Sequence, residues 1–255
     1  TYIYYADRLN QLPLGLIGIG LGTILLPTIS RMLSKGEDQA AMETQNRGIE
    51  LALFLTLPAT VAFITVAEPI VRGLFQYGRF SAEDAMRCGW ALSAFSIGLP
   101  SYVLVKVLTP GYYARGDTKT PVRYAMLSIA INIVGNLAMI PTLGHIGPPL
   151  ATALSSTVNV AMLYRTLVVR GHFTADPQLR RRIPRLAVAA VVMGLALWAG
   201  EDLLDPMLSG PMVSRYIGLA LLVGAGVALY GLACFVTGAY RLSDLKALMR
   251  RRGTP

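Results

Sequence analysis

The sequence predicts an all-α protein, a polytopic bundle of about seven transmembrane helices. Hydrophobic residues make up 54% of its 255 residues and charged residues only 15%, whereas a soluble domain carries about 25% charged residues. Mean hydropathy is accordingly positive, at +0.52. Apolar stretches long enough to cross the roughly 30 Å hydrocarbon core of a bilayer recur along the chain, and basic residues gather between them.

The first span covers residues 9–30, which are 22 residues without a charge, and Asp7 and Arg8 stand at its head. An arginine at the centre of a membrane helix costs about 2.5–3.5 kcal/mol on insertion scales. Arg8 therefore snorkels to the interface, pairs locally, or faces a solvated cavity in which its guanidinium binds an anion. Within the span, Gly18 and Gly22 form G-x-x-x-G, which predicts close packing against another helix.

Six more spans are predicted, at residues 51–67, 88–108, 124–140, 150–164, 186–200 and 216–240. The fourth and fifth of the seven lie in one stretch, residues 124–164, that has no Lys, Arg, Asp or Glu. A single helix of about 40 residues would be near 60 Å long. Because Gly and Pro cluster at residues 141–149, two spans joined by a tight turn fit better than one.

Local signals mark three helix starts. Ser81, with two acidic residues shortly after it, predicts a capped start to the helix of the third span. Thr120 followed by Pro121 predicts the N-cap and first residue of the fourth. Residues 34–37 are expected to cap a short amphipathic helix on the membrane surface.

The basic residues between the spans predict the orientation of the chain. With seven spans, eighteen of the 23 Lys and Arg residues fall on one side and four on the other, with Arg8 the remaining one. Lys and Arg are retained on the cytoplasmic side. The start of the chain and Gly78 are therefore expected outside, and Gly36 and the C-terminus inside.

Several polar or small residues within or beside the spans have two interpretations each. On the fourth and fifth spans, polar side chains recur at helical spacing, which indicates either interhelical hydrogen bonds or the lining of a solvated cavity: Ser128, Asn132, Asn136, Thr152, Ser155 and Asn159. Lys106 is expected to snorkel from the inner end of the third span. Ala220, Gly224 and Ala228 predict a packing face on the seventh. The cluster at residues 180–182 is expected to set topology and contact anionic lipid head groups.

No catalytic or metal-binding pattern is evident. The acids Glu201, Asp202 and Asp205 have no histidine beside them, as a membrane enzyme acting on polyprenyl phosphate would need. Cys88 and Cys234 lie in apolar stretches and predict neither a disulfide framework nor a metal site. The basic residues lie between apolar runs rather than on one polar face, which argues against nucleic acid as a partner. We expect a protein that is not an enzyme and needs no cofactor.

Five stretches resemble the MurJ/MviN family of lipid II flippases, in the multidrug/oligosaccharidyl-lipid/polysaccharide exporter superfamily. They are YYADRL at residues 4–9, LGTILLPTISR at 21–31, LFQYGRF at 74–80, VKVLTPGYYARGDTKTPV at 105–122, and the final helix pair. The likeness runs in order along the whole chain. Because the family has about twice as many spans, we expect this chain to be the C-terminal half of a longer protein.

The resemblance implies a function and a site. Residues 1–170 would form the five-span C-terminal lobe of a two-lobe exporter, and residues 171–255 a terminal helix pair with a basic tail. The arginine and aspartate of the family's Y-A-D-R motif, which hold the diphosphate of lipid II in a central cavity, fall on Arg8 and Asp7. The final helix pair would form a groove for the polyprenyl tail. Lipid II would cross the bacterial inner membrane by alternating access, with membrane lipids and other cell-wall synthesis proteins as further partners.

Three rival functions stay open at this point. The first is a flippase for another polyprenyl-linked oligosaccharide or a cation-coupled drug exporter of the same superfamily. The second is the membrane enzyme considered above, and the third is a membrane scaffold, which would have no need of Arg8.

Overall fold

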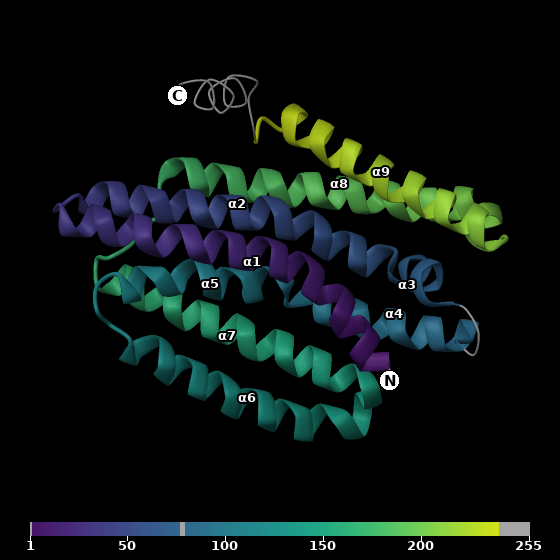
Figure 1. Cartoon of the computed structure of the whole chain (residues 1–255), viewed down its shortest axis with the longest axis horizontal. Helices are drawn as coiled ribbons and strands as arrows, with labels where there is room; N and C mark the ends of the chain where they lie inside the picture. The colour runs from purple at the N-terminus through teal and green to yellow at the C-terminus, as the bar shows by residue number, and fades with distance from the viewer. Residues whose placement is uncertain (1, 77–79, 240–255) are drawn as a thin grey trace.

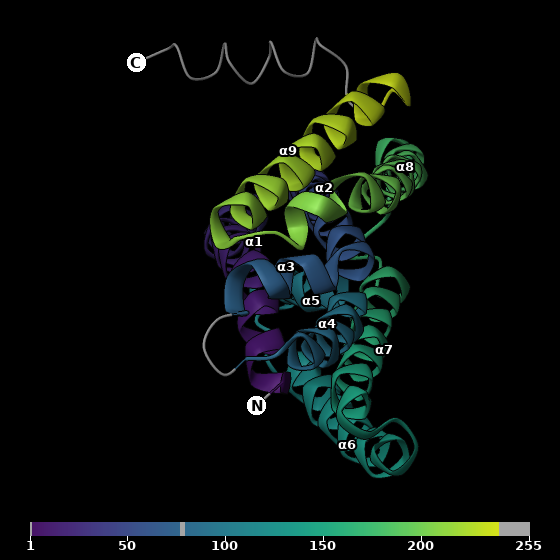
Figure 2. The ribbon, with the colours of Figure 1, turned by 90° about the vertical axis from the view of Figure 1, so that its right-hand side faces the viewer.

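The chain folds into a bundle of long helices that lie side by side, with α6 outermost at one edge and α9 at the other (Figures 1 and 2). The computed structural model describes residues 2–76 and 80–239. Within these ranges the α-helices are α1 (Tyr2–Ser34), α2 (Asp38–Thr65), α3 (Ala67–Phe75), α4 (Ala82–Ile97), α5 (Leu99–Tyr113), α6 (Lys119–Leu143), α7 (Gly147–Val169), α8 (Pro177–Leu208) and α9 (Met212–Val236).

The described residues contain six helical stretches long and apolar enough to cross a membrane. One of them, residues 119–169, turns back on itself through a short 3-10 helix, Gly144–Ile146, so that α6 and α7 form an antiparallel hairpin (Figure 1). Gly144 adopts a φ of 54°, a conformation that favours glycine. Counting α6 and α7 separately gives seven crossings, and the predicted all-α bundle is confirmed.

Proline explains two breaks that the predicted spans do not contain. The third span is split at Gly98 into α4 and α5, with Pro100 in the first turn of α5. The second span is followed, after Val66, by the separate helix α3, whose third residue is Pro69. A proline has no N–H to donate and its ring clashes with the carbonyl four residues earlier, so a continuous helix is interrupted at both places.

Of the three predicted helix starts, one is confirmed and two are wrong. Ser81 and Asp84 form a reciprocal capping box at the start of α4. The start of α6 is instead capped by Asp117, whose carboxylate accepts the Thr120 N–H at 3.0 Å. Ser34 begins no surface helix, because α2 starts at Asp38 directly after a turn at Gly36, where φ is 76°.

Small residues bring α1 close to α5, as the G-x-x-x-G motif predicts. A methyl group added to Gly22 would lie 3.9 Å from the Lys106 carbonyl oxygen, and one added to Gly18 would collide with the Lys106 side chain. The predicted packing face of α9 is wrong, because Ala220, Gly224 and Ala228 are all exposed in the described structure. The buried face of α9 lies on nearly the opposite side of the helix, at Gly218, Leu222, Gly226, Tyr230 and Cys234.

The core of the bundle is formed mainly by α1, α2, α4, α5 and α8, which contribute most of the side chains of its buried apolar cluster. Helix α6 buries only Thr120 and Pro121 and lies outermost (Figure 2). Helices α8 and α9 pack on the far side of α2, so the candidate polar site on α1 and the candidate apolar groove lie on different sides of one core.

Candidate functional site

The N-terminal half of α1 carries a linked set of polar side chains. Asp7, Arg8 and Gln11 are spaced three and four residues apart, which places Gln11 beside both of the others on a helix. Gln11 Nε2 donates to Asp7 Oδ2 at 2.5 Å, and Arg8 Nη1 donates to Gln11 Oε1 at 3.3 Å. Asp7 and Arg8 make no direct ion pair among the described residues, because adjacent helical residues point in different directions.

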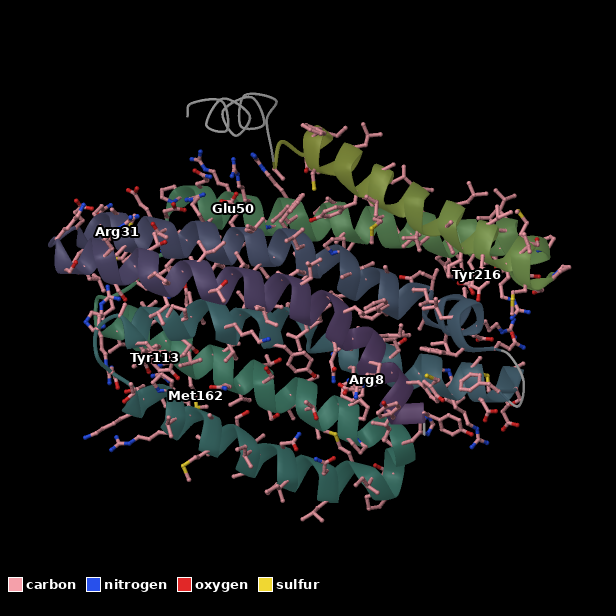
Figure 3. All side chains as sticks on the ribbon, viewed as in Figure 1. Arg8, Arg31, Glu50, Tyr113, Met162 and Tyr216 are labelled. Carbon is pink, nitrogen blue, oxygen red and sulfur yellow. The ribbon has the colours of Figure 1, made fainter. Side chains whose placement is uncertain are left out.

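Arg8 keeps its charge available. Its guanidinium carbon lies 5.0 Å from the centre of the Tyr4 ring, within the range of a cation–π contact. The side chain is exposed, whereas Asp7 is half-buried. Figure 3 shows Arg8 in the N-terminal half of α1, away from the end of the molecule where Arg31 lies. Within the described chain, Arg8 has a neutral hydrogen-bond partner and an aromatic ring, but no carboxylate to neutralise it.

Lys106 lies against the middle of α1. A methyl group on Gly18 would stand 2.7 Å from Lys106 Cδ and 3.0 Å from its Nζ, so the aliphatic stem crosses directly over the glycine. The side chain is half-buried and has no hydrogen bond or ion pair with any described residue. The prediction that Lys106 extends to the inner membrane surface is therefore wrong, since Gly18 holds the side chain at the middle of the 33-residue helix.

The polar stripes of the fourth and fifth spans meet at the α6–α7 interface. Ser128 Oγ donates to the Ser155 carbonyl at 2.9 Å, and Asn132 Nδ2 donates to Thr152 Oγ1 at 3.1 Å. Asn136 bonds back to Asn132. These contacts are the interhelical hydrogen bonds that the pattern allows. That the same side chains line a solvated cavity stays a prediction.

An apolar cavity of about 400 Å³ lies between α2, α3, α8 and α9. It is lined almost entirely by aliphatic and aromatic groups, and the hydroxyl of Tyr230 at its wall donates to the Phe54 carbonyl at 2.9 Å. Gly226 lets the two last helices approach, because a methyl group there would lie 2.9 Å from Leu197 Cδ2. The cavity involves the terminal helix pair, as the predicted groove does, but α2 and α3 also form part of its wall.

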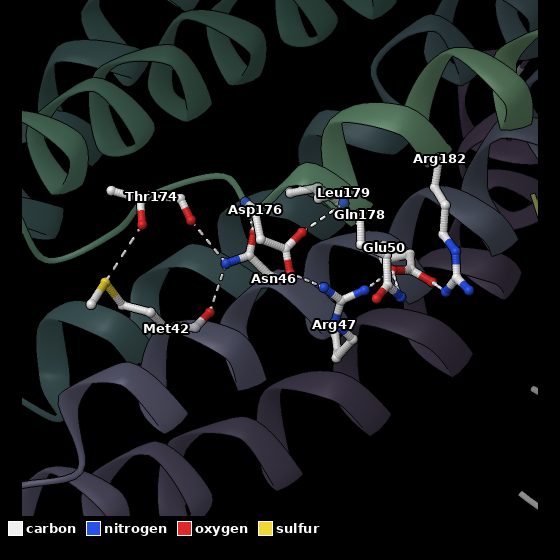
Figure 4. A network of polar contacts seen from close by, with 9 residues as sticks. All are labelled: Met42, Asn46, Arg47, Glu50, Thr174, Asp176, Gln178, Leu179 and Arg182. Atoms are coloured by element: carbon white, nitrogen blue, oxygen red, sulfur yellow. Dashed lines mark hydrogen bonds and ion pairs between the residues drawn. The ribbon is translucent and has the colours of Figure 1, made fainter. Parts of the chain in front are cut away.

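A buried ionic network joins α2 to the start of α8, and the sequence did not predict it (Figure 4). Glu50 is only 3% exposed, and its carboxylate forms ion pairs with Arg47 and Arg182. It also accepts a hydrogen bond from Gln178 Nε2 at 3.3 Å. Arg47 also pairs with Asp176, whose carboxylate caps α8 by accepting the Leu179 N–H at 2.6 Å. We call these residues the Glu50 network: Arg47, Glu50, Asp176, Gln178 and Arg182.

The Glu50 network corrects the prediction for residues 180–182, which were expected to set topology and contact anionic lipid head groups. Arg180 and Arg181 are exposed, but Arg182 is part of a buried pair. The signal was Glu50 itself, because an acidic residue bordering an apolar run needs a cationic partner. The five basic residues of the tail, 241–252, lie outside the described residues. Among the described residues, no group of three His, Cys, Asp or Glu side chains is placed to hold a metal ion.

Comparisons with known proteins agree with the fold. A family model described as lipid II flippase MurJ matches residues 1–217. The probable lipid II flippase MurJ of Rhizobium meliloti (strain 1021) is 41% identical over 251 residues, which are 98% of this chain and 47% of the relative. That of Vibrio cholerae serotype O1 is 39% identical over 247 residues, 97% of this chain and 47% of the relative.

A solved structure of a lipid II flippase MurJ, in an inward closed conformation, has the same fold. It matches with a TM-score of 0.73 at 24% identity, over 91% of this chain and 45% of that one. The chain thus spans about half the length of the relatives it matches. Similarity of this extent shows that the chain is a multi-pass membrane protein that belongs to the lipid II flippase MurJ family.

Proposed function

We propose that the protein containing this chain moves lipid II across the bacterial cytoplasmic membrane by alternating access, and that this chain supplies the C-terminal half of the transporter. The observation that carries the proposal is Arg8. It is a guanidinium in the N-terminal half of a membrane helix, in the family's Y-A-D-R motif, without a carboxylate partner among the described residues. A cation within a membrane helix costs free energy, so such residues are usually functional.

A diphosphate suits such a group. A guanidinium offers a rigid fork of N–H donors that matches phosphate oxygens in pairs, and it stays charged at any physiological pH. Asp7 beside it belongs to the same proposed site, held in place by Gln11. The polar residues at the α6–α7 interface, from Ser128 to Asn159, are the further proposed lining in the same lobe.

The apolar cavity suits the polyprenyl tail. Its lining residues give it almost no polar surface, so hydrocarbon is the chemistry that it favours. The tail would lie between α2, α8 and α9 while the head group lies beside α1. In this arrangement the chain enters the membrane from outside, and its C-terminal tail is cytoplasmic.

The test is complementation in cells depleted of their own flippase, using the full-length protein with membrane abundance measured in parallel. We expect Arg8→Ala to abolish growth at normal abundance, and Arg8→Lys to rescue poorly, because lysine keeps the charge but loses the fork. Arg123→Ala, at an exposed arginine of α6, is the matched control and should grow normally. Normal growth with Arg8→Ala would contradict the assignment of this residue.

A further inference from the structure

Gln11 is the centre of the polar group on α1. Its amide is the single described side chain that contacts both Asp7 and Arg8: it donates to the carboxylate at 2.5 Å and accepts from the guanidinium at 3.3 Å. An amide can do both because it carries an acceptor oxygen and two N–H donors on one planar group. A carboxylate or an ammonium at this position would provide only one of the two functions.

The amide does not neutralise the charge of Arg8. Gln11 is neutral, so it fixes the guanidinium without forming an ion pair, and the Tyr4 ring, which is also neutral, lies near the guanidinium carbon. A guanidinium has five N–H donors, and the described contacts use one of them. The remaining donors are therefore available to an anion, held in one orientation rather than spread over many rotamers.

The surroundings of Asp7 point the same way. The Tyr102 hydroxyl of α5 is buried without a hydrogen-bond partner among the described residues, so it does not donate to Asp7. Gln11 thus provides the hydrogen-bond donor that the described structure gives to the Asp7 side chain. A carboxylate satisfied in this way has less tendency to swing toward Arg8 and neutralise it.

We propose that Gln11 is a positioning residue for diphosphate binding, which holds the Arg8 fork open toward the ligand and keeps Asp7 from pairing with it. The inference rests on the proposed function, because it assumes that Arg8 contacts the diphosphate. It predicts that the hydrogen-bonding pattern of residue 11 matters, rather than its size or its packing.

The experiment compares Gln11→Met and Gln11→Glu in the full-length protein, reconstituted in nanodiscs, with undecaprenyl diphosphate as the probe. Methionine has a similar shape but no strong donor or acceptor, so we expect Gln11→Met to weaken binding about fivefold, the effect of one charge-linked hydrogen bond. Wild type measured under the same conditions sets the baseline. Gln39→Glu, at an exposed amide on α2, is the matched control.

Gln11→Glu separates hydrogen bonding from packing, because glutamate has nearly the size and shape of glutamine. A carboxylate at this exposed position is ionised near neutral pH, so it can pair with Arg8 but cannot donate to Asp7. Both changes oppose diphosphate binding, so we expect binding to fall further than in Gln11→Met.

The outcomes separate this inference from the proposed function. Binding by both Gln11 variants at the wild-type level, with loss in Arg8→Ala, would overturn the role of Gln11 alone. A smaller loss in Gln11→Glu than in Gln11→Met would also overturn it, since packing would then be the cause. Wild-type binding by Arg8→Ala would overturn the assignment of Arg8 instead.

Discussion

Single residues carry most of what the sequence could predict about the site. Asp7 and Arg8 stand out because charge is rare in an apolar helix, and the structure places both on α1 with Arg8 exposed. Gln11 was missed because an uncharged amide gives no comparable signal. Its spacing from Asp7 and Arg8 was readable, but only the coordinates show that both hydrogen bonds form.

Lys106 shows that the position of a long side chain cannot be predicted from its place along one helix alone. Its position near the end of a span predicts snorkelling. Because Gly18 has no side chain, however, the surface of α1 at that point is open, and the Lys106 side chain lies there instead. The ammonium therefore lies beside the middle of the first helix. The second half of this contact is on another helix, so the sequence near Lys106 could not reveal it.

Gly18→Ala should displace Lys106 without breaking the helix contact. The added methyl group meets the far end of a flexible side chain, which can move, and alanine favours the helix by about 1 kcal/mol over glycine. The two effects oppose each other, so we expect the thermal unfolding midpoint to change by less than about 4 °C. Gly15→Ala, which meets nothing within 4 Å, should raise the midpoint slightly. Both midpoints are measured on the full-length protein in detergent.

Gly147→Ala provides the contrast. There the methyl group would stand 2.9 Å from the Met139 carbonyl carbon, and the backbone of the hairpin cannot yield as a lysine side chain can. This variant should be clearly destabilised. If the unfolding midpoint of Gly18→Ala fell as far as that of Gly147→Ala, the close approach of α1 and α5 would be limited by backbone contacts rather than by the Lys106 side chain.

At the scale of the elements, the apolar runs located all seven spans but not their ends. At each of the seven predicted spans the helix begins before the predicted start, because charged residues at the ends of a helix can reach water. The buried face of α9 was predicted wrongly since small residues occur on two of its faces. Which face packs depends on the position of Leu197 on α8, and that is tertiary information.

The Glu50 network links the two parts of the predicted domain organisation. Arg47 and Glu50 come from α2, and Asp176, Gln178 and Arg182 come from the start of α8, so the network ties the terminal helix pair to the preceding bundle. A division of the chain near residue 170 stays a prediction. Removing one partner from a buried ion pair leaves a charge without compensation, which costs more than removing the whole pair.

Arg182→Gln should therefore destabilise the protein by about 2 kcal/mol, less than a fully broken buried pair because Arg47 still contacts Glu50. Arg180→Gln, two residues away and exposed, should have almost no effect. The measurement is chemical unfolding of the two variants side by side. The double variant Glu50→Gln with Arg182→Gln should cost less than the sum of the two single changes. Strict additivity would show that the two side chains do not interact.

At the scale of the whole molecule, the arginines on the side predicted to be outside have local partners. Arg72 pairs with Glu68 at 3.0 Å, and Arg87 pairs with Glu83 at 2.6 Å. Arg215 donates to the carbonyls of Arg72 and Gln76. Arg79 lies outside the described residues. The orientation itself stays a prediction that rests on the distribution of Lys and Arg between the spans.

The orientation is testable by cysteine labelling of the intact cell. Cys88 and Cys234 are buried and are first replaced by alanine. Gly78 lies outside the described residues, and Gly36 has a φ of 76° that a cysteine would strain, so neighbouring exposed positions serve better. Lys35→Cys lies between α1 and α2, on the predicted cytoplasmic side. Ser209→Cys follows α8, on the predicted outer side.

A membrane-impermeant maleimide should label Ser209→Cys in whole cells and reach Lys35→Cys only after the membrane is opened. The reason is that eighteen of 23 basic residues fall on the side of Lys35 when the spans are counted as seven. Thr142→Cys, at the end of α6, tests the count itself. It should behave like Ser209→Cys if α6 and α7 each cross the membrane. Labelling of Lys35→Cys from outside would reverse the orientation. Protection of Thr142→Cys beside a labelled Ser209→Cys would contradict the crossing of α6, and the proposed path of the substrate would fall with it.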